Sequence, residues 1–163
     1  MQNIMAVDPG TFESAYVLID VNTRYIYDKA KIDNKDVLRK LQDLNSNNVH
    51  LVVEQIKSYG NAMGDSLIET CVWTGRFLQV WGSNYTLIPR KAVAAHICHN
   101  SRAGDSNIRQ AIIDSYGGNL KLLRGTQKKP GPLHGVTYDI WSALALALTY
   151  IEQSEEKLGG MLV

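Results

Sequence analysis

Short apolar runs separated by turn residues fill the first third of the chain. Residues 4–7 and 15–19 are apolar, and each run ends at a turn-forming sequence that contains an aspartate. A third predicted strand covers residues 25–32, where the side chains alternate and one side of the strand carries Ile26, Asp28, Ala30 and Ile32. The pattern predicts three strands joined by short turns in an antiparallel meander.

The apolar spacing changes to a helical period after these strands. Residues 37–44 carry valine and leucine at helical intervals behind Asp33-Asn34, a predicted N-terminal cap. The β-branched run at 49–53 then predicts a buried strand that leads directly into Glu54. The order so far is β-β-β-α-β.

The rest of the chain predicts helices that alternate with one more strand. The final segment is apolar nearly all round, which predicts a helix packed deep inside the domain. Asp105 or Ser106 is the predicted cap of one earlier helix. The order predicts a single α/β domain over residues 1–163. Its later elements are a helix over 61–81 that stops at Gly82, a strand over 85–88, helices over 90–99 and 106–116, a Gly/Pro-rich loop over 121–132 and a helix over 137–153.

The composition favours an ordinary folded protein. Of 163 residues, 45% are hydrophobic and 20% are charged, which excludes disorder, collagen-like repeats and disulfide scaffolds. No apolar stretch approaches the roughly 20 residues that cross a membrane. Two cysteines, Cys71 and Cys98, suit a reducing compartment. We therefore expect a cytoplasmic protein, in a bacterial host if a phage encodes it, without a membrane partner.

The net charge of +1 hides an uneven distribution of charge along the chain. Taken as a whole, near neutrality argues against a protein that binds polyanions. Residues 84–130, however, hold eight lysines and arginines against two aspartates, so this segment alone carries +6. Phosphate contacts require such a concentration of positive charge. The basic residues of the segment are Arg90, Lys91, Arg102, Arg109, Lys121, Arg124, Lys128 and Lys129.

Three carboxylates stand where predicted buried elements begin or end. Asp8 follows the first strand, Glu54 follows the fourth, and Asp139 begins the final helix. Burying a carboxylate is costly unless it is paired or binds a cation, and oxygen ligands from separate elements suit Mg²⁺ or Mn²⁺. Taken singly, each has a plainer explanation: a turn residue, a solvent-facing strand end, and an acid favoured by the helix dipole. Their combined spacing favours a metal site.

These motifs resemble the RuvC Holliday-junction resolvases, particularly divergent phage-type members. The resemblance covers nearly the whole chain and implies an RNase H-like fold, with a five-stranded mixed sheet flanked by helices. It also implies a homodimer that acts on branched DNA, above all four-way junctions, with forks and three-way branches left open. The motifs are Asp8-Pro9-Gly10, Val53-Glu54-Gln55 and Asp139-Ile140-Trp141-Ser142-Ala143-Leu144-Ala145.

The chemistry implied by the resemblance is Mg²⁺-dependent phosphodiester hydrolysis, with Mn²⁺ able to substitute. One ion activates the attacking water and a second stabilises the leaving oxygen, so the products carry 5′-phosphate and 3′-hydroxyl ends. Asp8, Glu54 and Asp139 are the implied catalytic carboxylates. A two-fold dimer would place two such sites against two strands and give paired nicks.

One position departs from the family pattern in the final helix. Bacterial members carry a second acidic or histidine ligand three residues into this motif, where the present chain has Ser142, a poorer ligand for Mg²⁺. Ser142 is therefore the fourth member of the expected metal set, with the three carboxylates. His134, a few residues upstream, is the candidate to compensate, as a ligand or a proton shuttle; the alternative is an exposed polar loop residue.

A second departure concerns DNA contacts. The family's base-contacting aromatic, three residues after the glutamate, falls on Lys57, with Tyr59 close by. Tyr59 could stack on a base and Lys57 could contact phosphate, although an ordinary strand-to-helix loop explains both as well. Two other functions stay open: a YqgF-type nuclease of structured RNA, and a junction-binding protein without catalysis. The expected DNA-binding residues are Lys57, Tyr59, Arg90, Lys91, Arg102, Arg109, Lys128 and Lys129.

Overall fold

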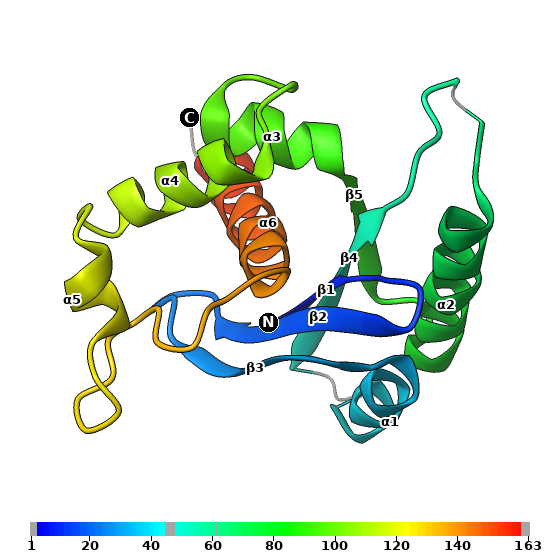
Figure 1. Ribbon diagram of the computed structural model, residues 1–163, viewed down its shortest axis with the longest axis horizontal. Helices are drawn as coiled ribbons and strands as arrows, with labels where there is room; N and C mark the ends of the chain where they lie inside the picture. The colour runs from blue at the N-terminus through cyan, green and yellow to red at the C-terminus, as the bar shows by residue number, and fades with distance from the viewer. Residues whose placement is uncertain (1–2, 45–47, 61, 161–163) are drawn as a thin grey trace.

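A five-stranded mixed sheet forms the centre of the structure, a computed structural model that describes residues 3–44, 48–60 and 62–160 (Figure 1). The strand order is β3-β2-β1-β4-β5. The first three strands are antiparallel neighbours, and β4 and β5 add to β1 in parallel. This confirms the predicted mixed sheet. The strands are β1 (Asn3–Asp8), β2 (Glu13–Asp20), β3 (Ile26–Asp33), β4 (Val49–Gln55) and β5 (Tyr85–Pro89).

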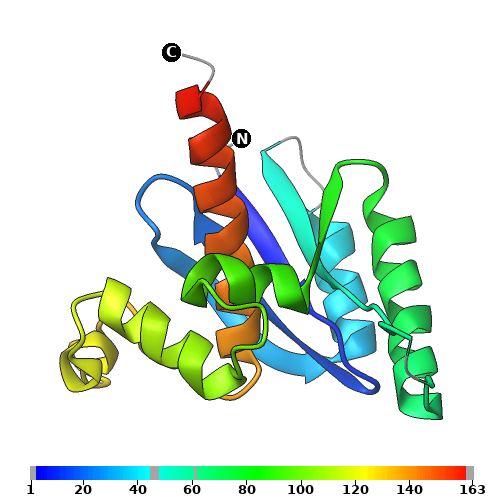
Figure 2. The ribbon, with the colours of Figure 1, turned by 90° about the horizontal axis from the view of Figure 1, so that it is seen from above.

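Helices cover both faces of this sheet (Figures 1 and 2). On one face Met5 and Val7 of β1 belong to the core beneath α1 and α2, and on the other Ile4 and Ala6 belong to the core beneath α6. Because strand side chains alternate, Asp8 continues the α6 side of β1. The helices are α1 (Asn34–Leu44), α2 (Asp65–Trp81), α3 (Arg90–Cys98), α4 (Asp105–Ser115), α5 (Leu120–Arg124) and α6 (Ile140–Gly160).

The final helix is buried as its sequence predicts. Every residue from Ala143 to Thr149 of α6 is buried, because the helix lies between the sheet and the α3–α4 pair. It begins at Ile140 rather than at 137, since Thr137 and Tyr138 form a turn before it, and it continues beyond the predicted end at 153. Asp139 therefore lies just before the first turn of α6.

Of three other predicted boundaries, two differ in the structure and one is confirmed. Residue 61, where the pattern starts the second helix, lies outside the described residues, and α2 begins at Asp65. The predicted stop at Gly82 is confirmed: its N–H donates to the Leu78 carbonyl, and its φ of 98° suits glycine. The predicted cap of α4 is wrong, because Gly104 occupies that position without a side-chain hydrogen bond, and Asp105 instead pairs with Arg90.

A bulge in the β2–β3 pairing overturns one predicted strand face. The register shifts between Leu18 and Ile19, so Ile26 packs in the core beneath α6, whereas Ala30 and Ile32 pack on the α1 side. The prediction that Ile26 shares a side with Ile32 is wrong, since an extra residue inverts the alternation. Lys31 lies on the opposite side of β3 from Ile32, on the α6 side of the sheet, where it binds Asp139.

The predicted loop at 121–132 holds more order than its composition indicates. Its beginning is helix α5, and a tight hairpin follows, closed by a bridge between Gly125 and Pro130. Gly131 lies against this turn, where an added Cβ would come within 2.3 Å of the Leu123 carbonyl oxygen. The lysines Lys128 and Lys129 project from the exposed hairpin.

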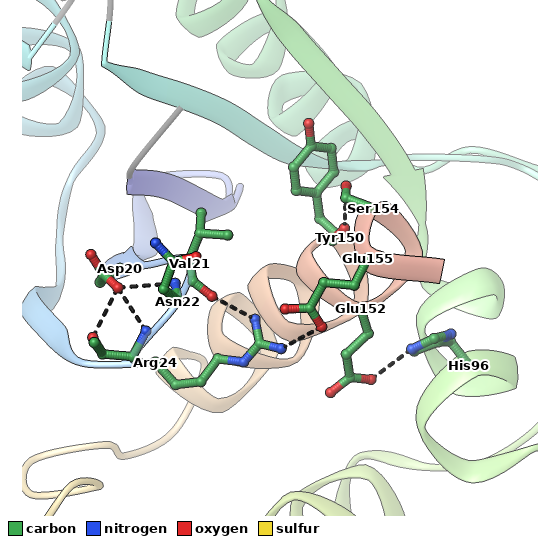
Figure 3. A network of polar contacts seen from close by, with 10 residues as sticks. Asp20, Val21, Asn22, Arg24, His96, Tyr150, Glu152, Ser154 and Glu155 are labelled. Atoms are coloured by element: carbon green, nitrogen blue, oxygen red, sulfur yellow. Dashed lines mark hydrogen bonds and ion pairs between the residues drawn. The ribbon is translucent and has the colours of Figure 1, made fainter. Parts of the chain in front are cut away.

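Two ion pairs fix the far half of α6 (Figure 3). Arg24 Nη2 lies 2.9 Å from Glu155 Oε2, and His96 Nε2 lies 2.7 Å from Glu152 Oε2. The first ties α6 to the β2–β3 turn and the second ties it to α3. These contacts orient the helix whose other end carries Asp139 and Ser142. In the part of the chain that the structure describes, no helix is both long and apolar enough to span a membrane.

Candidate active site

Asp8 and Glu54 end two adjacent parallel strands. β1 and β4 run in register, with Val7 opposite Val53, so the next residue of each strand lies at the same edge of the sheet. Both side chains fall on the α6 side, because they follow Ala6 and Val52 of that core at the two-residue spacing of a strand. The sequence prediction that these carboxylates converge is therefore met by the strand pairing.

The electrostatics of this pair favour neutralisation. Burial, followed by the charges of Glu54 and Asp139, raises the pKa of Asp8 to about 7, although Arg90 and a hydrogen bond from Ser142 act in the opposite direction. Burial also raises the pKa of Glu54 against the opposing charge of Arg90. Since like charges in a low-dielectric site resist ionisation together, the two carboxylates are stabilised by any added positive charge.

The start of α6 supplies two further groups. A hydrogen bond from the Ser142 hydroxyl lowers the pKa of Asp8, so this hydroxyl lies close to the Asp8 carboxylate. Asp139 lies near enough for its charge to act on Asp8, but its Oδ2 is held 2.7 Å from Lys31 Nζ. That hydrogen bond raises the pKa of Lys31 and keeps it a cation. Lys31 therefore neutralises one of the four predicted ligands.

A rigid turn supports Asp8 from below. The buried Asn34 side chain donates to the carbonyls of Gly10 and Thr11, at 2.9 and 3.2 Å, and accepts from the Ser14 hydroxyl at 2.6 Å. Gly10 is required here, because a Cβ would lie 2.2 Å from the Glu13 carbonyl oxygen. The Asp8-Pro9-Gly10 turn is thus fixed on both sides, which holds the end of β1 in place.

A cleft of about 530 Å³ opens beside Asp139 and Ser142. Three guanidinium groups border it, from Arg90, Arg109 and Arg124, and Arg109 lies over the Trp141 ring with its Cζ 5.1 Å from the ring centroid. This combination of positive charge and open volume suits a phosphate-bearing ligand. Its lining residues are Arg90, Asp105, Ser106, Ile108, Arg109, Arg124, Thr137, Tyr138, Asp139, Trp141 and Ser142.

The donor set fits a hard divalent cation, although it is not closed around one. Among the described residues, no three histidine, cysteine, aspartate or glutamate side chains converge tightly enough to form a complete cation site. The oxygen ligands of Asp8, Glu54 and Ser142 nonetheless match the preference of Mg²⁺, which keeps several waters and needs few protein ligands. Burial and the two neighbouring carboxylates raise the pKa of Asp8 in spite of the charge of Arg90, so an added cation would stabilise its charged form.

His134 has a hydrogen-bond partner of its own in the backbone of α5. Its Nδ1 donates to the Arg124 carbonyl oxygen at 2.8 Å, which ties the approach to α6 against the end of α5. His134 is not among the residues that border the cleft. Its hydrogen bond explains a structural role, and a catalytic role remains only a prediction.

The predicted DNA-binding residues divide into those that border the cleft and those that do not. Arg90 and Arg109 border it. Tyr59 lies in the loop that follows β4, and the Lys91 ammonium group lies 3.7 Å from the centroid of its ring. That cation–π contact occupies one face of the ring. Lys57, Arg102, Lys128 and Lys129 are exposed and lie outside the cleft lining.

Three residues near the site escaped prediction as site residues. Arg124 counted toward the basic segment, but only the return of α5 brings it beside Arg90 and Arg109. Lys31 was not predicted because its partner, Asp139, lies more than 100 residues away in the sequence. Tyr138 was available to sequence reasoning, since it is an aromatic residue adjacent to Asp139.

The chain has the fold of RuvC. No protein-family model matches the sequence, and no curated protein matches it. Among solved structures, a Thermus thermophilus RuvC structure matches with a TM-score of 0.65 and 14% identity, over 95% of this chain and 96% of that one. T. thermophilus RuvC in complex with a Holliday junction substrate matches with a TM-score of 0.59 and 14% identity, over 91% of this chain and 92% of that one. The predicted fold is therefore confirmed.

Proposed function

We propose that this protein is a Mg²⁺-dependent, structure-selective endodeoxyribonuclease that resolves four-way DNA junctions. The carrying observation is the pair of partly buried carboxylates, Asp8 and Glu54, at the ends of β1 and β4, with a raised pKa on each. Buried groups with strongly perturbed pKa values mark sites that act on charge. The arginine-bordered cleft beside them and the RuvC fold support a DNA substrate.

The residues of the chain divide the work of phosphodiester hydrolysis. Asp8, Glu54 and Asp139 would hold Mg²⁺, with Ser142 as a weak ligand or as the donor that orients Asp8. When bound, Mg²⁺ supplies an activated water and stabilises negative charge on the phosphate. Arg90 lies close enough to lower the pKa of both strand-end carboxylates, so its charge can also face a phosphate. Mn²⁺ is expected to replace Mg²⁺, because both prefer oxygen ligands.

Lys31 has a defined part in this proposal. Its ammonium group holds Asp139 in the absence of another cation. For Asp139 to become a ligand, this exposed ion pair must open, and exposed pairs of this kind are worth only about 1 kcal/mol or less. The cost of recruiting Asp139 is therefore small.

A homodimer would match two sites to the two strands that must be cut. The outer side of α2 exposes Ile68 and Val72, one helical turn apart, at 49% and 43% of their surface. Adjacent apolar side chains on an exposed helix face are typical of protein interfaces. We expect sedimentation analysis to give a dimer, and an Ile68→Lys variant to give a monomer.

The decisive experiment is cleavage of a four-way DNA junction. With Mg²⁺ the protein should make paired nicks that a ligase can seal, and the matched linear duplex should stay intact. Asp8→Asn should abolish cleavage, whereas Asp43→Asn, an exposed aspartate on α1 at the opposite face of the sheet, should retain it. Cleavage of structured RNA with indifference to the junction would favour a YqgF-type activity and contradict the proposal.

A junction-binding protein without catalysis is the second candidate. Ser142 at a ligand position and Asp139 held by Lys31 favour it, because both reduce the number of available carboxylates. This candidate requires tight junction binding in EDTA and no cleavage in Mg²⁺ or Mn²⁺. The same assay therefore separates it from the nuclease.

A further inference from the structure

Tyr138 combines backbone strain with exposure at the edge of the cleft. Its φ is 43°, in the left-handed region that bulky residues rarely adopt, and 87% of its surface is exposed. It precedes Asp139 directly and borders the cleft. A tyrosine in such a position lowers the stability of the folded chain through its backbone, and its exposed ring gains almost no burial that would offset this cost.

Of the three other non-glycine residues with positive φ in the described chain, His99 is the left-handed C-cap of α3, and the remaining two have compensating side-chain contacts. Arg24 binds Glu155, and Tyr59 carries Lys91 over its ring. Within the described residues, Tyr138 makes its hydrogen bond through its backbone, where its carbonyl oxygen accepts a hydrogen bond from the Trp141 N–H. The ring gains nothing inside the protein that would offset its cost. Strain of this kind that persists at the edge of a site points to a role toward a ligand.

The surroundings of Tyr138 define what that ligand offers. Arg109 and Arg124 border the same cleft and supply positive charge, while Thr137 adds a polar group. A ligand that presents a phosphate to the arginines and a flat apolar surface to the ring is a nucleotide. The base must be unstacked, because a base inside a duplex has both faces covered by its neighbours.

We propose that the Tyr138 ring stacks on an unstacked base next to the phosphate that is cut, and so positions the DNA strand at Asp139. This inference rests on the proposed nuclease function and deepens it. Unstacked bases occur where strands separate at a branch, so the contact would favour a branch point over continuous duplex. Tyr138 is a positioning residue in this role, since it touches the substrate beside the reacting group.

The test is a thermodynamic cycle between the ring and the base. Junctions carrying one abasic position, moved in turn through the nucleotides around the cut, are bound by Asp8→Asn protein with and without a second change, Tyr138→Gly. If the ring stacks on one base, Tyr138→Gly weakens binding of the intact junction about tenfold. It has no further effect on the junction that lacks that base. Additive effects at every position would overturn the inference.

Three controls separate stacking from a structural role. Tyr138→Phe keeps the ring and should retain normal binding. Tyr25→Ser removes an exposed tyrosine, 62% accessible, beside the Asn3–Asp20 end of the sheet, away from Asp8, and should also bind normally. Tyr138→Gly should raise Tm, because glycine adopts positive φ without strain. A lower Tm for Tyr138→Gly would indicate a structural role instead.

Cleavage kinetics complete the test in the otherwise unchanged protein. Tyr138→Gly should raise KM for the junction about tenfold, with a smaller change in kcat, because the ring binds the strand without taking part in the chemical step. If the wild-type protein cuts junctions and Tyr138→Gly has an unchanged KM, the inference about Tyr138 is wrong and the proposed function still holds. Failure of the wild-type protein to bind or cut junctions would overturn the proposed function together with it.

Discussion

Two groups of partly buried carboxylates in this protein have opposite electrostatics. At the edge of the sheet beneath α6, the pKa of Asp8 is raised to about 7 by burial and by two neighbouring carboxylates. Around β3 and α1, burial also acts on Asp28, but hydrogen bonds from Lys40 and Tyr16 outweigh it and lower the pKa. Lys40 Nζ lies 2.5 Å and Tyr16 Oη 2.9 Å from Asp28 Oδ2. Asp28 makes a direct ion pair with Lys40, whereas at Asp8 the more distant charge of Arg90 does not outweigh burial and the two neighbouring carboxylates.

The contrast separates a structural carboxylate from a functional one. Asp28 contributes stability because its charged form is solvated by protein groups. Asp8 and Glu54 lower stability when both are charged, and the fold tolerates them only because the rest of the core is well packed. A carboxylate site whose negative charge the folded protein balances only in part can bind a cation from solution.

The largest expected effect tests whether Asp8 is functional. Asp8→Asn should reduce junction cleavage by at least about 10³-fold, because the amide cannot replace the charge that holds Mg²⁺. Asp28→Asn should leave the cleavage rate within about twofold of wild type. The measurement is single-turnover cleavage of a labelled junction in Mg²⁺. Equal losses from the two variants would remove the distinction between the two groups.

The next effect is a pH dependence of opposite sign for the two groups. The folded pKa of Asp8 lies above its unfolded value of 3.8, so between about pH 4 and pH 7 the folded state holds a proton that the unfolded state has released. The free energy of unfolding should therefore fall as pH rises through this window, by up to about 4 kcal/mol. Asp28, with a lowered pKa, should instead lose its stabilisation only as pH falls below about 4.

Chemical denaturation in EDTA between pH 4 and pH 8 measures this dependence. Asp8→Asn should flatten the fall in stability, because the titrating group is gone. Adding Mg²⁺ at pH 8 should restore stability to the wild-type protein but not to Asp8→Asn. A wild-type curve that stays flat from pH 4 to pH 7 would show that Asp8 ionises normally.

A smaller effect tests whether Asp28 is structural. Lys40→Met removes the ammonium group that lies near Asp28 and over the Tyr16 ring. It should lower the free energy of unfolding by about 1 kcal/mol and leave cleavage unchanged. Lys35→Met, an exposed lysine on the same helix, is the matched control and should change stability by less than about 0.5 kcal/mol. Loss of cleavage in Lys40→Met would connect this cluster to the site.

The smallest effect sharpens the role of Ser142. Ser142→Asp adds a carboxylate beside Asp8 and should lower the Mg²⁺ concentration for half-maximal cleavage about threefold. Ser154→Asp, at the other end of α6, should leave that concentration unchanged. A higher Mg²⁺ requirement in Ser142→Asp would show instead that the serine acts as the hydrogen-bond donor that orients Asp8.

The elements of the fold were predictable where local sequence dominates. β1 and β2 contain continuous apolar runs, β4 is apolar over 49–53 except for His50, and the first half of α6 is apolar nearly all round, so their burial follows from local sequence. The side of β3 was not predictable, because the bulge at Leu18 and Ile19 depends on how β2 pairs with its neighbour. The prediction of the α4 cap was wrong for a similar reason, because Asp105 forms an ion pair with Arg90, which lies 15 residues earlier.

The residues of the site also divide into those that local sequence predicts and those that it does not. Its three carboxylates stand at the ends of predicted elements, and a turn or a helix start identifies each of them in the sequence. Their neighbours do not: Lys31 reaches Asp139 across more than 100 residues, and Arg124 joins the cleft only through the return of α5. Side-chain partners at such separations depend on packing that no local pattern encodes.

The sequence by itself determined the order of the strands and of the helices other than α5, the three carboxylates at their ends and the basic segment within a nearly neutral chain. Those features follow from residue type and short-range periodicity, which local physics controls. Only the tertiary structure decided that β1 and β4 are neighbours in register, that Lys31 neutralises Asp139, and that Tyr138 stands exposed beside the cleft. These depend on contacts between distant segments, whose free energies are settled together when the sheet and α6 pack.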